Sequence, residues 1–146
     1  MFAIGLNYAS HAGESGFDVP KDPVVFMKHV SSFAGPDVDV HLSGDTVDWE
    51  AELVAVIGGG GRNISEAEAW DHVEGFSVGQ DLSDRTVQFW GHPPQFSLGK
   101  SRSGFSPAAV VCKRHAECPF VGSVLLLTRR VNSAPCRVRA ELPTFH

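Results

Sequence analysis

The stretch VDWEAELVAVIG, residues 47–58, decides the fold class because its side chains follow the two-residue period of a β-strand. Successive side chains of a strand point to opposite faces. One face carries Asp48, Glu50, Glu52, Val54 and Val56, and the other carries Trp49, Ala51, Leu53, Ala55 and Ile57. Both faces are apolar over residues 54–57, so we expect this end of the strand to be buried on both sides.

Glu50 and Glu52 lie on one face, next to the apolar end of this strand. Same-face neighbours are about 7 Å apart, and at an effective dielectric constant of about 20 two carboxylates at that distance repel by roughly 2 kcal/mol. A hard cation such as Mg²⁺ removes this repulsion; the alternative is a solvated strand end, which the spacing alone favours. Asp81, where a second apolar strand ends in GQDLSDR, adds a third carboxylate and shifts the balance towards a metal site.

The rest of the first 107 residues also has mainly the patterns of strands. We expect strands within residues 2–9, 24–30 and 76–85, and a strand, a turn and a second strand over residues 35–58. One helix is expected, with Ser65 as its N-cap, Glu68 closing the capping box and Gly75 ending it. These elements predict a β-rich α+β fold with few helices.

The composition is that of a soluble globular protein of one domain. The chain has 146 residues, of which 42% are hydrophobic and 20% charged. A net charge of −5 gives no basic surface for nucleic acid or for an anionic membrane. The N-terminus does not resemble a signal peptide, and the three cysteines are an odd number without secretory context. We therefore expect a cytoplasmic protein with free thiols.

The composition changes after Pro107. Beyond Asp84 the only acidic residues are Glu117 and Glu141, whereas six of the twelve Lys and Arg residues and all three cysteines follow Pro107. One interpretation is a basic surface segment that contacts a partner. The other, which we favour, is a segment that was never selected to complete this fold, for instance after a change of reading frame or an altered splice.

A second polar pair lies near the N-terminus, in NYASHAGES. His11 and Glu14 are three residues apart and would meet on one side of a helical turn. A histidine polarised by a carboxylate is a common general base, although an exposed loop histidine is the interpretation that the residues alone favour. Gly13 and Gly16 would allow this segment to move as a lid.

Two lysines are further candidates. Lys100 follows an apolar segment, where it could bind an anionic substrate or an enolate, or simply cap a strand end. Lys28 lies inside a strand pattern and would reach the end of the strand or a pocket. By contrast, the spacing of the tail residues does not favour zinc at Cys112, His115 and Cys118.

Five segments in order resemble the fumarylacetoacetate hydrolase family, over about residues 2–107. They are IGLNYASHAGESG, PVVFMKHVSS, VDWEAELVAVIG, GFSVGQDLSDRTVQ and FSLGKSRSGFSP. The resemblance implies a mixed β-sandwich or roll, usually dimeric, and an enzyme. Its implied metal ligands, for Mg²⁺ or alternatively Mn²⁺ or Ca²⁺, are Glu50, Glu52 and Asp81. Its implied catalytic residues are the lid pair His11 and Glu14 together with Lys100, and its implied substrate-binding residues are Lys28, Arg85 and Gln88.

The chain departs from the family pattern after Pro107, because neither a GPW-like continuation nor a later Gly-Thr-Pro segment is recognisable. We therefore expect a partial catalytic domain over residues 1–107 and a divergent basic tail, disordered or foreign to the fold, over residues 108–146. The fold would then be incomplete at its C-terminus. An incomplete sheet leaves edge strands exposed and weakens the expectation of a homodimer.

The resemblance implies a Mg²⁺-dependent hydrolase that cleaves C–C bonds in small 2-oxo or dioxo acids, such as acylpyruvates, often in the breakdown of aromatic compounds. A decarboxylase, isomerase or hydratase of the same family, of the 2-hydroxyhepta-2,4-diene-1,7-dioate type, would use the same residues. Two non-enzymatic alternatives are a truncated remnant and an interaction module with a basic tail.

Overall fold

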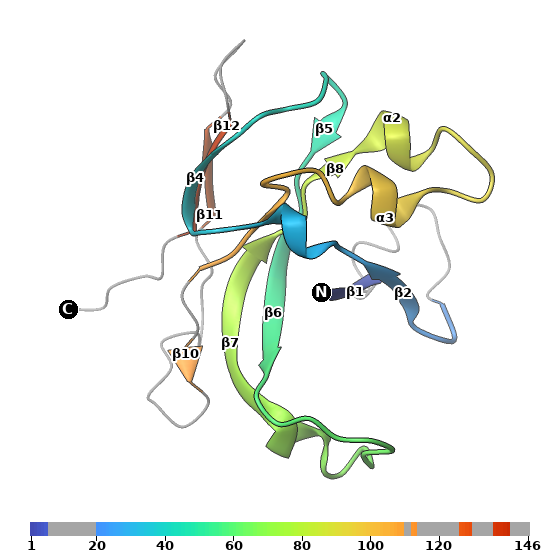
Figure 1. Ribbon diagram of the computed structural model, residues 1–146, viewed down its shortest axis with the longest axis vertical. Coiled ribbons are helices and arrows are strands. Elements are labelled where there is room, and N and C mark those ends of the chain that lie inside the picture. Colours follow the sequence, from blue (N-terminus) through green and yellow to red (C-terminus); the bar gives the residue numbers. More distant parts are fainter. Residues whose placement is uncertain (6–19, 110–111, 114–125, 130–135, 141–146) are drawn as a thin grey trace.

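The computed structural model describes residues 1–5, 20–109, 112–113, 126–129 and 136–140. Within these residues the chain is rich in strands and has two short α-helices (Figure 1), which confirms the β-rich α+β class. The strands are β1 (Phe2–Gly5), β2 (Val24–Met27), β3 (Phe33–Ala34), β4 (Asp37–Val40), β5 (Val47–Asp48), β6 (Ala51–Ile57), β7 (Val73–Gln80), β8 (Ser83–Asp84), β9 (Ser106–Pro107), β10 (Cys112–Lys113), β11 (Leu126–Arg129) and β12 (Cys136–Ala140). The helices are α2 (Arg85–Gln88), α3 (Phe96–Gly99) and the 3₁₀ turns η1 (Val30–Ser32) and η2 (Ala69–His72).

The antiparallel pair β6–β7 is the longest feature of the fold. Its register sets Ala51 opposite Gln80 and Val56 opposite Gly75, with a bulge after Val56. The short strand β10 continues the sheet on the far side of β7, so the strand order is β10-β7-β6. Among the described strands, β6 is therefore an edge of this sheet.

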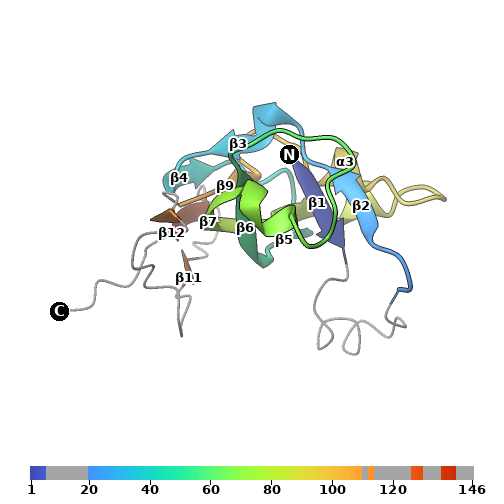
Figure 2. The same ribbon diagram turned by 90° about the horizontal axis from the view of Figure 1, so that it is seen from below.

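Smaller sheets flank this pair. On one side β4 joins β12 and β11, and on the other β1 pairs with β2 (Figure 2). The parallel pair β3–β9 places Phe33 opposite Ser106, and β5–β8 places Val47 opposite Asp84. Both pairs join the early strands to the segment after β7, where the polar site lies.

The apolar core of the described residues is small. Val40, Val47, Leu82 and Phe105 form one buried cluster, with Val38 packed against it. These residues come from β4, β5 and the segment between β7 and β9, so the core lies directly beside the residues that follow β7.

The helix expected from Ser65 to Gly75 is wrong. Ser65 and Glu68 do contact each other, because the Ser65 hydroxyl donates to a Glu68 carboxylate oxygen at 2.7 Å, but they close a turn that leads only into η2. Trp70 is the one large apolar anchor here, and it contacts Phe76 with 6.4 Å between ring centroids. Pairing with β6 takes residues from Val73 onward into β7, and strand pairing overrides the capping signal.

The predicted burial of both faces of residues 54–57 is also wrong. Leu53 is 57% exposed and Ile57 is 62% exposed, and their shared face is covered by no described element. None of the described helices has the length and apolar character that crossing a bilayer requires.

Candidate active site

The β6–β7 ladder sets the predicted carboxylates on one face. Just before β6 begins, the Glu50 amide donates to the Asp81 carbonyl at 3.2 Å, and the Asp81 amide donates to the Glu50 carbonyl at 2.8 Å. Such a directly opposed pair points its side chains to the same face of the sheet. Glu52 lies two residues further along on that face, opposite Gly79, which has no side chain. The three carboxylates therefore share one face of the hairpin.

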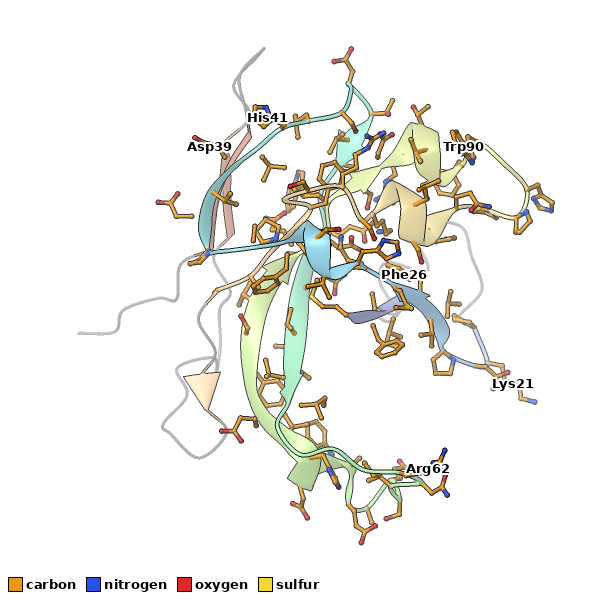
Figure 3. All side chains as sticks on the ribbon, in the orientation of Figure 1. Lys21, Phe26, Asp39, His41, Arg62 and Trp90 are labelled. Atoms are coloured by element: carbon orange, nitrogen blue, oxygen red, sulfur yellow. The ribbon has the colours of Figure 1, made fainter. Side chains whose placement is uncertain are left out.

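Lys100 lies between two of these carboxylates. Its Nζ donates to Asp81 Oδ2 at 2.7 Å, to Ser83 Oγ at 2.7 Å and to Glu50 Oε2 at 3.2 Å. Lys100 caps the C-terminal end of α3 and is only 2% exposed. Its Nζ also lies 5.3 Å from the ring centroid of Phe26, which Figure 3 labels near β2. The end of α3 thus delivers a positive charge to the carboxylate face.

Lys28, directly after β2, pairs with the other oxygen of Asp81. Its Nζ also donates to the carbonyl oxygens of Phe105, at 2.9 Å, and Leu82, at 3.3 Å. Burial lowers the pKa of Lys28, and the attraction of Asp81 opposes this without cancelling it. Asp81, only 5% exposed, therefore binds two ammonium groups at once.

Arg85 opens α2 and binds the outer side of the same cluster. Its Nη2 pairs with Asp48 Oδ2 at 2.9 Å and with Glu50 Oε1, and its Nη1 donates to Gln88 Oε1 at 2.9 Å. Burial tends to raise the pKa of Glu50, but Lys100 and Arg85 outweigh it and hold the pKa below the ordinary 4.5. The Asp84 carboxylate accepts the Val87 amide at 3.1 Å and so caps α2, which fixes the position of Arg85.

We call these six residues the ion-pair cluster. Its positive members are Lys28, Arg85 and Lys100, and its negative members are Asp48, Glu50 and Asp81. The opposite charges are equal in number, which offsets much of the cost of removing them from water. The six residues come from four segments that are distant in the sequence, so the cluster forms only in the folded chain.

The donor set fits a divalent cation in its chemistry. Carboxylate oxygens are the ligands that Mg²⁺ and Mn²⁺ prefer, and Glu50 and Asp81 already gather around the positive charge of Lys100. Glu52 shares their face. In the part of the chain that the structure describes, however, no three His, Cys, Asp or Glu side chains stand close enough together to hold a metal ion. A metal site here therefore requires Glu52 and its neighbours to draw together.

The structure brings together most of the predicted site residues. A continuous series of ion pairs runs from Lys28 through Asp81, Lys100 and Glu50 to Arg85, and Gln88, almost fully buried, supports Arg85. Glu52 lies on the same face of the hairpin. His11 and Glu14 lie outside the described residues, so their pairing stays a prediction.

Three contributors were missed by the sequence analysis. Ser83 lies two residues after Asp81 in a strand-like segment, so alternation could have placed it beside the lysine. Asp48 shares the face of Glu50, and the same pattern could have assigned it as a partner of Arg85. The Phe105 carbonyl is a backbone atom and carries no signal in the side-chain pattern.

Buried titratable groups with shifted pKa values, such as Lys28 and Glu50, are enriched in active sites, although structural ion-pair networks shift pKa values as well. The model of the fumarylacetoacetate (FAA) hydrolase C-terminal family matches residues 1–138. The chain therefore belongs to the fumarylacetoacetate hydrolase family, whose members include hydrolases, isomerases and an oxaloacetate tautomerase. The match runs past Pro107, into the segment expected to be divergent.

Three relatives illustrate the range of this family. The mitochondrial oxaloacetate tautomerase fahd2 of Xenopus laevis is 42% identical over 109 residues, which are 73% of this chain and 34% of the relative. The fumarylpyruvate hydrolase of Pseudomonas aeruginosa, in complex with Mn²⁺ and pyruvate, superposes with a TM-score of 0.70 at 30% identity, covering 77% of this chain and 52% of that one. The 5-carboxymethyl-2-hydroxymuconate delta-isomerase of Mycobacterium smegmatis gives 0.68 at 32% identity, covering 81% and 47%. This chain thus spans about a third to a half of the length of these relatives.

Proposed function

We propose that this chain carries the metal-dependent site of a hydrolase that cleaves a C–C bond in a small 2-oxo or dioxo acid, such as an acylpyruvate. One observation carries the proposal: Glu50 and Asp81 converge on a buried positive charge, with Glu52 on the same face. The Mn²⁺ and pyruvate bound to the Pseudomonas aeruginosa relative support a divalent cation and a 2-oxo acid. Glu50, Glu52 and Asp81 would hold the cation, with Mg²⁺ as the expected ion and Mn²⁺ or Ca²⁺ as alternatives.

Each residue of the proposed site then has a defined role. A bound divalent cation supplies Lewis acidity and compensates negative charge. Lys100 lies where it can stabilise the oxygen that becomes negatively charged as the C–C bond breaks. Lys28 fixes the Asp81 carboxylate, and Arg85 fixes Glu50. His11, oriented by Glu14, would take a proton from the water that attacks the distal carbonyl.

An isomerase, decarboxylase or hydratase is the second candidate. Isomerisation and decarboxylation need the same stabilised negative charge and a proton carrier but no attacking water, whereas a hydratase adds water to a double bond. The isomerase from Mycobacterium smegmatis and the tautomerase from Xenopus laevis support this candidate. The products decide between the candidates: hydrolysis yields two acids, isomerisation one product of unchanged mass, decarboxylation a smaller acid and CO₂, and hydration one product heavier by one water.

The division of the chain is a proposal as well. We propose that residues 1–107 form the unit that bears the site and that residues 108–146 are a divergent tail. Every contact of the ion-pair cluster described above lies between residues 26 and 105, which supports the division. Yet β10 pairs with β7 and β12 pairs with β4, so parts of the tail contribute strands to the sheets.

The decisive test is Glu52→Gln, assayed for Mg²⁺- and Mn²⁺-dependent turnover of an acylpyruvate and for metal binding by calorimetry. We expect both to be lost, because one of three oxygen ligands is weakened. Glu66→Gln, the same change at an exposed residue, is the matched control and should leave both unchanged. Full activity and full metal binding in Glu52→Gln would show the metal assignment to be wrong.

Inactivity of the unaltered chain would favour a non-catalytic remnant, provided that it is folded and binds the metal ion. A chain that binds no metal and captures a protein through residues 108–146 would instead favour an interaction module. Cytoplasmic location and a role in the breakdown of aromatic compounds stay predictions.

A further inference from the structure

A hollow of about 270 Å³ lies beside the two short helices α2 and α3. Its lining comes from the segment after β2, from α2 and the residues beyond it, and from α3 and the residues beyond it: His29, Val87, Trp90, Leu98, Ser101 and Arg102. None of the six residues of the ion-pair cluster lines it. Pockets for drug-sized molecules start at about 300 Å³, so this hollow suits a smaller ligand.

The two helices separate the hollow from the cluster. In α2, Arg85 and Gln88 lie one turn apart and contact each other on the cluster side. Val87 is about 200° round the helix from Arg85, and it lines the hollow. Lys100, at the end of α3, reaches the cluster, whereas Leu98, two residues earlier, lines the hollow. Opposite sides of the same helices therefore face the cluster and the hollow.

The polar part of the hollow is rich in hydrogen-bond donors. Asp84, which is 4% exposed, accepts the Val87 amide at 3.1 Å and pairs with Arg102 Nη2 at 3.2 Å, so one buried carboxylate holds two of the walls together. A guanidinium has five N–H donors, and this ion pair occupies one nitrogen of Arg102. Ser101 Oγ accepts the His29 amide at 3.0 Å, so its hydroxyl hydrogen is a separate donor. A fixed guanidinium with a hydroxyl beside it suits a carboxylate group.

The rest of the hollow is apolar. Trp90, two residues beyond α2, is 67% exposed, and Leu98 is 50% exposed (Figure 3). An indole ring packs well against another aromatic ring. Together with Val87, these side chains give the hollow a wall that suits a flat apolar body.

We propose that this hollow binds a small aromatic carboxylate. Its carboxylate group would lie against Arg102 and Ser101, and its ring against Trp90 and Leu98. This ligand class differs from the 2-oxo and dioxo acids proposed for the carboxylate face. Because the residues that line the hollow are not those of the cluster, binding here needs no metal ion.

Titration calorimetry of the unaltered full chain with three probes tests the ligand class. Benzoate carries both features, acetate lacks the ring, and benzyl alcohol lacks the charge. We expect benzoate to bind in the millimolar range and at least about tenfold more tightly than either of the other two, because each of them loses one part of the contact. Undetectable binding of benzoate, or equal affinity for all three probes, would overturn the proposal.

A negative charge placed in the hollow tests the location. Leu98→Asp should weaken benzoate binding by about tenfold or more, because its carboxylate repels that of the ligand. Leu53→Asp is the matched control: Leu53 is exposed to a similar degree but lies on β6, and its change should leave benzoate binding unaltered. Equal effects of the two variants, or none from Leu98→Asp, would show that benzoate binds elsewhere.

The role of the guanidinium is tested by Arg102→Gln, with Arg62→Gln as the control at an exposed loop residue. We expect about a tenfold loss of benzoate affinity in the first and no change in the second. Unchanged affinity in a folded Arg102→Gln would show the carboxylate contact to be wrong. Because Arg102→Gln also leaves the buried Asp84 without its partner, Leu98→Asp keeps the proposal testable if this variant fails to fold.

Pyruvate with Mg²⁺ distinguishes this site from the proposed substrate site. Saturating pyruvate and Mg²⁺ should leave the dissociation constant of benzoate unchanged, and Glu52→Gln should bind benzoate like the unaltered chain. Competition between pyruvate and benzoate would mean that the hollow belongs to the substrate site, which refutes this inference but not the proposed function. Benzoate binding by a chain that binds no metal ion would refute the proposed function alone.

Discussion

The ion-pair cluster and the edge of β6 bury opposite kinds of side chain. Lys28, Asp81 and Lys100 are almost completely covered, whereas Leu53 and Ile57 are mostly exposed. Folded proteins ordinarily do the reverse, and lysine and aspartate are seldom buried unless they are paired. The described structure therefore buries charged side chains that are paired with one another and leaves an apolar face of β6 exposed. Four experiments test this difference, from the largest expected effect to the smallest.

Removing the centre of the cluster should have the largest effect. Asp81→Ala leaves Lys28 and Lys100 buried without their shared counter-charge, and breaking a buried pair in this way costs about 3–5 kcal/mol. Urea denaturation followed by circular dichroism measures the loss. Asp45→Ala, in an exposed turn, should change the free energy of unfolding by less than about 0.5 kcal/mol. Equal losses from the two variants would contradict the buried cluster.

Two leucines compare the core with the edge directly. Leu82 is almost fully buried in the apolar cluster, so Leu82→Ala should lower the free energy of unfolding by about 2–5 kcal/mol. Leu53→Ala should lower it by less than about 0.5 kcal/mol, because this side chain is more than half exposed. A large loss at Leu53 would mean that this face of β6 is covered in the folded protein.

The free energy of unfolding should also depend on pH through Glu50. Its pKa in the folded chain lies below the ordinary 4.5, so the unfolded chain binds the proton more readily. The stabilisation is complete above pH 4.5 and is lost as the pH falls through the lower folded value. Glu50→Gln should flatten this part of the stability profile, measured by denaturation at a series of pH values. An unchanged slope in Glu50→Gln would mean that Glu50 is not stabilised by the cluster.

The smallest effect is expected at a site that belongs to neither region. Ser65→Ala removes a hydrogen bond within an exposed turn, so the free energy of unfolding should change by less than about 0.5 kcal/mol. Loss of a true helix N-cap would cost about 1 kcal/mol. If thermal denaturation showed the larger loss, the helix originally expected over residues 65–75 would be supported.

Alternation along single strands was predictable from the sequence. It placed Glu50 and Glu52 on one face, and the strand class of residues 51–57 followed from the same pattern. The partner of each residue was not predictable in this way, because the opposition of Glu50 and Asp81 depends on a register that two distant segments choose together. The exposure of Ile57 could not be predicted either, because alternation shows which side chains share a face but not whether another element covers that face.

The lysines illustrate this limit most clearly. Lys100 was predicted to bind an anionic substrate or an enolate, or to cap a strand end, and in the structure its ammonium group contacts two carboxylates. The sequence spacing could not show that these carboxylates are the predicted metal ligands. Asp81 follows β7 and Lys100 follows α3, so their contact depends on how these two elements pack. The helix predicted from the capping residues at Ser65 failed for a related reason, because pairing with β6 draws the following residues into β7.

The contact of Lys28 with the Phe105 carbonyl bridges 77 positions of sequence. An ordered cluster can form only after both ends of that span have left the ribosome, and synthesis proceeds at roughly 5–20 residues per second. Until then Asp81 and its lysines remain hydrated, and closure of so long a loop is slow compared with local hairpin formation. The β6–β7 hairpin should therefore appear first during synthesis, with its charged end still open to water, and the cluster should close as one of the last steps.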